Sequence, residues 1–98
     1  MEKQALTEIL RDRGEKYGPF MRHAQISQDI KQAIFKYTKG KEKLSDDKIE
    51  ALEMIAHKIA RIINGDPNYA DSWDDIAGYA TLIANNIKEA HAAITKTA

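Results

Sequence analysis

The sequence predicts an all-α fold: a mostly antiparallel four-helix bundle with short loops, formed by one domain over residues 1–98. Apolar residues recur at helical spacing in four segments, and no segment alternates apolar and polar residues for long enough to form a strand. With 43% hydrophobic and 31% charged residues, the chain can bury one core of modest size. Since there is no cysteine to staple that core, we expect a homo-oligomer that buries more surface.

Two helices are predicted in the first part of the chain, an amphipathic one over residues 2–13 and a second over about residues 21–37. Residues 14–19 between them contain two glycines and Pro19, which disfavours helical backbone at the residue before it, so they are predicted to form a turn. The lysine-rich loop from Lys39 to Lys43 has no helical period and is expected to be solvated.

The third helix is predicted to begin near Asp46, because Ser45 is a favourable N-cap. Asn64 and Gly65 are expected to end it, and Pro67 enforces the stop. Its apolar positions fall within one arc when each residue is advanced by about 100°. They are Ile49, Leu52, Ile55, Ala56, Ile59, Ile62 and Ile63.

The fourth helix is expected to begin at Asp71 or Ser72 and to run to about Lys96. Its predicted buried face comprises Trp73, Ile76, Ala77, Tyr79, Ala80, Ile83, Ala84, Ile87, Ala90 and Ile94. Gly78 lies inside this helix, where a glycine costs about 1 kcal/mol relative to alanine. We expect the close approach of a neighbouring helix, or of a ligand, to offset that cost.

Fifteen basic residues balance fifteen acidic ones, so we expect no general binding to nucleic acid or to a membrane. Residues 1–65 carry a net charge of +3 and residues 66–98 one of −3, which suits a match within the chain or between subunits. No charged and apolar leader precedes the first helix, and no apolar run approaches about 18 residues. The expected location is the cytoplasm.

Polar side chains at the edge of an apolar arc are the candidate binding residues, since they face a cleft between helices. The third helix offers Glu53, His57 and Arg61, and the fourth offers Ser72, Asp75 and Tyr79. If the two edges face each other, these residues converge near the connecting loop. Simpler readings stay open: Glu53 and His57 form a helical i, i+4 pair, and Asp75 only favours the helix start.

A second candidate lies around the first turn, where Arg13 and Tyr17 belong to a basic and aromatic cluster. Arginines bind phosphate through two parallel N–H groups, and a tyrosine ring offers a stacking surface. The cluster is either an anion site that closes over the pocket or a solvated surface.

Four segments together resemble a family of small, uncharacterised phage and prophage proteins over Ile9 to Ile87. They are EKYGPF, LEMIAHKIARI, GDPNYADSW and DDIAGYATLI. More distantly, the chain resembles the all-α nucleoside triphosphate pyrophosphohydrolases of the MazG kind, which hold Mg²⁺ with an ExxE and an ExxD motif. That resemblance carries over to Glu53 and Asp75 as metal ligands and implies Mg²⁺ as a candidate cofactor, although Ser72 stands where the motif has Glu.

Three functions are therefore considered for this chain. The first is a phage-derived helical protein of a bacterial host cell that binds a nucleotide or another phosphorylated small molecule in a cleft between its third and fourth helices. The second is a Mg²⁺-dependent nucleoside triphosphate pyrophosphohydrolase. The third is a protein-binding inhibitor of a host enzyme or defence system. Whether the protein is an enzyme is left open.

Overall fold

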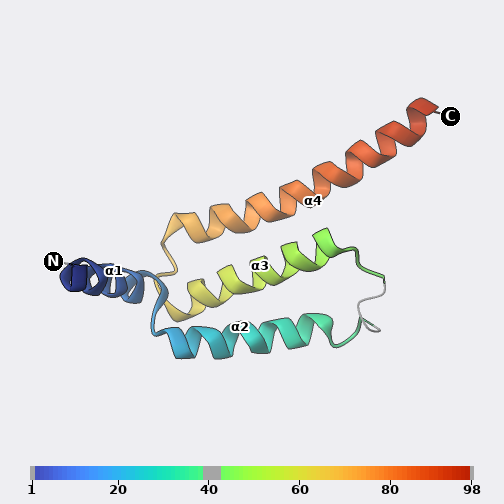
Figure 1. The fold of residues 1–98 in the computed structure, drawn as a ribbon. Helices are drawn as coiled ribbons and strands as arrows, with labels where there is room; N and C mark the ends of the chain where they lie inside the picture. Colours follow the sequence, from blue (N-terminus) through green and yellow to red (C-terminus); the bar gives the residue numbers. More distant parts are fainter. Residues whose placement is uncertain (1, 39–42, 98) are drawn as a thin grey trace.

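The computed structural model describes residues 2–38 and 43–97, and within them it contains four α-helices and no strand. The helices are α1 (Glu2–Tyr17), α2 (Phe20–Phe35), α3 (Asp46–Asn64) and α4 (Ala70–Thr97), as Figure 1 shows. The predicted all-α fold is confirmed. Residues 39–42 of the lysine-rich loop lie outside the described residues.

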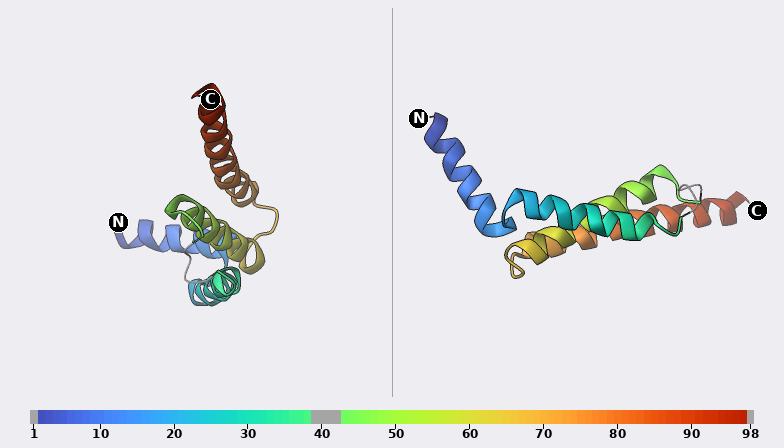
Figure 2. Two further views of the ribbon diagram at one scale, coloured as in Figure 1. Left: turned by 90° about the vertical axis from the view of Figure 1, so that its right-hand side faces the viewer. Right: turned by 90° about the horizontal axis from the view of Figure 1, so that it is seen from below.

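The central helix is α3, which packs against α2 on one side and against α4 on the other (Figure 1). Along this row α3 runs antiparallel to α2, and α4 runs antiparallel to α3. Toward its C-terminus α4 diverges from α3, and α1 projects from the end of the molecule where α2 begins (Figures 1 and 2). The helices therefore form an open row with α1 attached at one end.

This open row leaves little interior. The chain measures 61 × 28 × 26 Å with a radius of gyration of 17.5 Å, whereas a compact domain of about 100 residues has one of about 13 Å. The buried apolar residues are three alanines of α3, Ala51, Ala56 and Ala60, and no large side chain is fully buried among the described residues. Only α3 is covered on two sides.

The first helix is longer than predicted, because α1 continues through Gly14 to Tyr17. The predicted turn over residues 14–19 is therefore wrong for its first four residues. A glycine weakens a helix without removing a hydrogen bond, and the Gly18 N–H still donates to the Gly14 carbonyl at 2.8 Å. The break comes at Gly18, whose φ is +77°, and at Pro19, which has no N–H to donate.

The predicted limits of α3 are confirmed at both ends, with Ser45 at the N-cap position. The Ser45 hydroxyl donates to the Asp47 carboxylate, and its side chain makes no capping bond to the helix backbone. One residue of the predicted apolar arc, Ile63, is 61% exposed. Neighbouring helices therefore cover only part of the predicted apolar arc.

The predicted buried face of α4 is largely wrong within a single chain. Trp73 is 55% exposed and Ile94 is 66% exposed, because α4 packs only on α3 and its C-terminal part diverges from it (Figure 1). A Cβ atom added at Gly78 would meet nothing within 4 Å. The close approach predicted there does not occur in the chain by itself.

Candidate functional site between helices α1, α2 and α3

Hydrogen bonds tie the α1–α2 turn to the C-terminal end of α3. The Asn64 side-chain amide donates to the carbonyls of Tyr17 and Pro19, both at 2.9 Å, and the Asp66 backbone N–H donates to the Lys16 carbonyl at 2.7 Å. A Cβ atom at Gly65 would overlap that Lys16 carbonyl. A glycine there therefore permits the two backbones to meet.

This attachment creates a pocket of about 400 Å³ between α1, the turn, α2 and α3. Its wall combines two arginines, two histidines and two aromatic rings with the backbone of the turn. The side chains are those of Leu10, Arg13, Tyr17, Phe20, His23, His57 and Arg61. Among the residues that the structure describes, no acidic one lines the pocket, so the fixed charges of its described wall are both positive.

The two arginines are available to an anion. The Arg61 guanidinium lies over the Tyr17 ring, with its central carbon 4.1 Å from the ring centroid, an arrangement that fixes the guanidinium plane and leaves its edge N–H groups for other partners. Within the part of the chain that the structure describes, neither Arg13 nor Arg61 forms an ion pair with a carboxylate.

The ring contacts continue outward from the pocket. The Tyr17 ring meets the Tyr69 ring edge-on, with centroids 6.0 Å apart. The Lys16 ammonium lies 4.9 Å above the Tyr69 ring, and the Tyr69 hydroxyl donates to Asp71 at 2.9 Å. These contacts hold Tyr17 in place from its outer side and connect the pocket to the start of α4.

The two histidines form a partly buried pair. His23 Nε2 and His57 Nδ1 are 3.3 Å apart, so one ring N–H donates to the other ring nitrogen, and the rings meet edge-on with centroids 4.5 Å apart. Burial first, then the positive charge of Arg61, lowers the pKa of His57 to about 4. Burial and Arg61 also lower the pKa of His23. Both rings are therefore neutral at neutral pH.

One polar atom of this pair lacks a partner. His23 is only 6% exposed, and its Nδ1 atom makes no hydrogen bond within the described structure. Leaving a buried polar atom unpaired costs about 1 to 3 kcal/mol. A water molecule or a bound ligand would recover part of that cost by pairing with this nitrogen.

The predicted site residues separate into groups. Arg13, Tyr17, His57 and Arg61 lie together in this pocket, as the prediction of an anion site near the first turn would require. Glu53 instead lines a hollow against α2.

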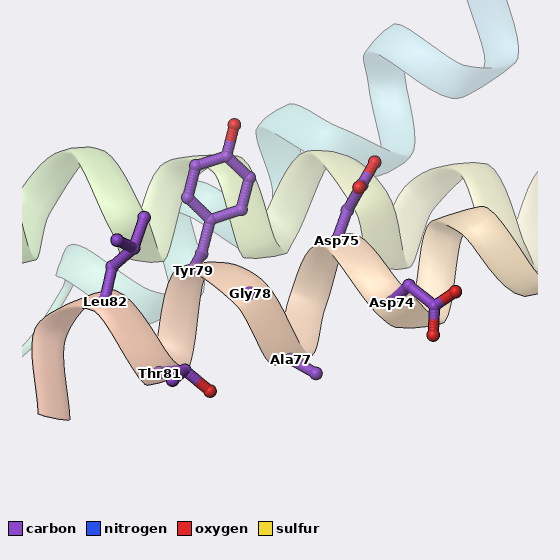
Figure 3. A pocket seen from close by; sticks show the side chains of 7 residues that line it. All are labelled: Asp74, Asp75, Ala77, Gly78, Tyr79, Thr81 and Leu82. Carbon is purple, nitrogen blue, oxygen red and sulfur yellow. The ribbon is translucent and has the colours of Figure 1, made fainter. Parts of the chain in front are cut away.

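The three predicted residues of α4 lie elsewhere. Asp75 forms an ion pair with Lys58 of α3 at 2.9 Å, and Ser72 is 3% exposed. Tyr79 lines an open hollow of about 610 Å³ along α4 together with Asp75. Figure 3 shows Asp75 and Tyr79 pointing to one side of α4 and Ala77 to the other. The six residues of the two predicted edges therefore do not share one pocket.

The proposed metal ligands lie apart as well. Glu53 and Asp75 line different hollows, and in the described portion of the chain no three His, Cys, Asp or Glu side chains form a group that could hold a metal ion. Mg²⁺ generally needs carboxylate or phosphate oxygens around it. Mg²⁺ binding through Glu53 and Asp75 stays a prediction.

Three side chains of the pocket, those of Leu10, Phe20 and His23, were not among the predicted ligand-binding residues. His23 belongs by its place in the sequence to the basic and aromatic cluster around the first turn, and this nearness to Arg13 and Tyr17 was the available signal. Phe20 is 75% exposed and lines the pocket only because the turn folds toward α3. No pattern in the sequence indicates that the α1–α2 turn folds toward α3.

The space between α3 and α4 has a different character. An apolar groove of about 300 Å³ lies there, with Leu52 and Ile55 on one side and Ala80, Ile83 and Ile87 on the other. In addition, none of the helices is long and apolar enough to cross a membrane, as judged over the described residues.

Comparison with known proteins gives a family but no activity. The model of DUF6378, described as a domain of unknown function, matches residues 2–87. No curated protein and no solved structure matches the chain. The match spans most of the 98 residues, and the chain therefore belongs to the DUF6378 family.

Proposed function

We propose that this protein binds a phosphorylated small molecule in the pocket between α1, α2 and α3. The observation that carries the proposal is the pair of arginines, Arg13 and Arg61, which line a pocket without an acidic residue. Arg61 is half-buried, and a half-buried guanidinium without a carboxylate partner is costly. A polyanionic ligand would supply the missing counter-charge.

The chemistry of the wall favours phosphate over a simple carboxylate. Two guanidinium groups offer several N–H donors to the oxygens of one or two phosphoryl groups. The rings of Tyr17 and Phe20 add an aromatic surface on the same pocket, which suits the planar base of a nucleotide. The volume of about 400 Å³ lies within the range of ordinary small-molecule sites.

The histidine pair suits an anion as well. His57 is neutral in the free protein at neutral pH, since its pKa is lowered to about 4. An anion beside the ring would raise that pKa and favour the imidazolium form. Binding would then take up a proton, and the affinity for a phosphorylated ligand would increase as the pH falls below neutrality.

Isothermal titration calorimetry with inorganic pyrophosphate and a nucleoside triphosphate tests the proposal. We expect binding by the wild type and a loss of about tenfold to a hundredfold in affinity for Arg61→Ala, since a charge-assisted hydrogen bond contributes about 1.5 to 3 kcal/mol. Arg13→Ala should weaken binding in the same direction. Arg11→Ala is the matched control, because Arg11 is exposed on the same helix and does not line the pocket.

Two results of these titrations would contradict the proposal. If neither compound binds to the wild type, or if Arg61→Ala and Arg11→Ala bind with the wild-type affinity, the pocket is not a phosphate site. The titrations should be run with Mg²⁺ and again with a chelator. Release of pyrophosphate from the nucleoside triphosphate only with Mg²⁺ would instead favour the pyrophosphohydrolase hypothesis.

The remaining finer predictions stand beside this proposal as hypotheses. They are the phage origin, the kinship with pyrophosphohydrolases of the MazG kind, the location in the host cytoplasm and the inhibition of a host protein. Membership of DUF6378 is compatible with each of them and supports none in particular. The homo-oligomer also stays a prediction, and the exposed apolar residues of α4 bear on it separately.

A further inference from the structure

The single chain exposes more surface than a compact monomer of the same mass. Its accessible surface is 7630 Å², while a compact monomer of 11.1 kDa exposes about 5,700 Å². The excess is about 1,900 Å² per chain, and covering it on two chains would bury about 3,800 Å². That area is typical of an obligate homodimer, which buries about 2,000 to 5,000 Å² in total.

A regular apolar stripe on α4 accounts for part of this excess. From Trp73 to Ile94, residues separated alternately by four and three positions lie along one side of the helix. We call the apolar ones the α4 seam: Trp73, Ala77, Ala80, Ala84, Ile87 and Ile94, with His91 at the position between the last two. This is the heptad spacing of helices that pack against a parallel or antiparallel partner. All of its members except the half-buried Ala84 are exposed.

The seam borders the apolar groove between α3 and α4. Ala80 and Ile87 of the seam line that groove, and Leu52 and Ile55 of α3 form its opposite side. In Figure 3, Ala77 points away from the side on which Asp75 and Tyr79 lie. The apolar surface of the seam therefore continues into the groove.

We propose that a second copy of this chain covers the α4 seam, with the two α4 helices packed antiparallel about a two-fold axis near residue 82. In this register each isoleucine of the seam meets an alanine of the other copy. Ile87 faces Ala77, Trp73 faces His91, and Ala80 faces Ala84. A parallel pair would instead stack alanine on alanine over three successive layers and leave voids beside Trp73.

The charges of α4 favour the same orientation. Residues 70–83 contain three aspartates and no basic residue, while residues 84–97 contain two lysines and one glutamate. Antiparallel packing brings the acidic half of one helix beside the half of the other that has a small net positive charge. It also aligns the two helix dipoles favourably. The interface thus combines apolar burial with charge complementarity.

Light scattering after size-exclusion chromatography tests the dimer. The wild type should elute with a mass of about 22 kDa, twice the 11.1 kDa of one chain. Ala77→Glu should shift the mass to that of a single chain, because it places a charge in the seam at a residue that is exposed in the monomer. Asn85→Glu is the control and should stay dimeric, since Asn85 is exposed on another side of α4.

Cysteine cross-linking tests the orientation and does not depend on a disruptive substitution, because the chain has no cysteine of its own. In the antiparallel pair the two copies of residue 77 are about 15 Å apart along the axis, too far for a disulfide. Only a mixture of Ala77→Cys and Ile87→Cys should then cross-link. A wild type that is monomeric at all concentrations, or a dimer unaffected by Ala77→Glu, overturns the proposal. Efficient cross-linking of Ala77→Cys to itself overturns the antiparallel arrangement.

Discussion

Replacing Asn64 tests the attachment that forms the pocket. Its side-chain amide donates to the carbonyls of Tyr17 and Pro19, both at 2.9 Å and across 47 and 45 residues of sequence. Two substitutions remove these bonds in different ways. Asn64→Ala removes the side chain, whereas Asn64→Asp keeps its shape and replaces the donor by an acceptor that faces two carbonyl oxygens.

The expected magnitudes follow from these bonds. Each contributes a net of about 0.5 to 1.5 kcal/mol to the free energy of unfolding, so Asn64→Ala should cost about 1 to 3 kcal/mol. The loss should lie toward the lower value, because the Asn64 Oδ1 atom is itself buried without a partner among the described residues. Asn64→Asp should cost more than Asn64→Ala at neutral pH, since it leaves a carboxylate charge against two acceptors.

Urea unfolding followed by circular dichroism measures these differences, with all variants at one protein concentration so that any self-association is constant. Asn85→Ala is the control, because Asn85 is exposed, and it should change the free energy of unfolding by less than about 0.5 kcal/mol. Lowering the pH to protonate the new aspartate should restore part of the loss. An Asn64→Asp variant as stable as the wild type would refute the reasoning.

Two further predictions concern the same end of the molecule. Gly65→Ala should cost about 1 to 3 kcal/mol through steric overlap with the Lys16 carbonyl. A Cβ atom at Gly14 meets nothing within 4 Å, so Gly14→Ala should instead stabilise α1 by up to about 1 kcal/mol. Thermal unfolding compares the two variants, and equal effects on stability would contradict the close contact at Gly65. The free energy of unfolding should also fall as the pH drops from 6.5 toward 4, because the unfolded chain takes up a proton there that His57, with its pKa lowered to about 4, does not. After allowance for solvent screening this loss is about 1 to 2 kcal/mol. His57→Gln should flatten the profile in urea titrations over that range, and an unchanged slope would show that His57 is not the group responsible.

The sequence predicted the helices better than it predicted what covers them. The limits of α3 follow from local signals, Ser45 at the start and Asn64 with Gly65 at the end, and such signals act within a few residues. Periodicity shows which residues share a side of a helix. It does not show whether a second helix lies there, which is why Trp73 and Ile94 were expected to be buried and are exposed in one chain.

The candidate site was accessible from the sequence only in pieces. Arg13 and Tyr17 were identified as one group, and His57 and Arg61 as members of another, from their charge and spacing. What unites them is the contact of the α1–α2 turn with the end of α3, made through backbone carbonyls. Any residue has a carbonyl group, so no side-chain pattern marks such a contact.

The central claim is that a phosphorylated ligand binds between α1, α2 and α3. The most direct measurement is a nuclear magnetic resonance titration of the ¹⁵N-labelled protein with inorganic pyrophosphate, followed at the glycine amides. Gly14 and Gly18 line the pocket, while Gly78 lies in the hollow along α4. The account predicts saturable shifts at Gly14 and Gly18, little change at Gly78, and loss of the response in Arg61→Ala. Shifts confined to Gly78, or no saturable shift at any of these glycines, would contradict it.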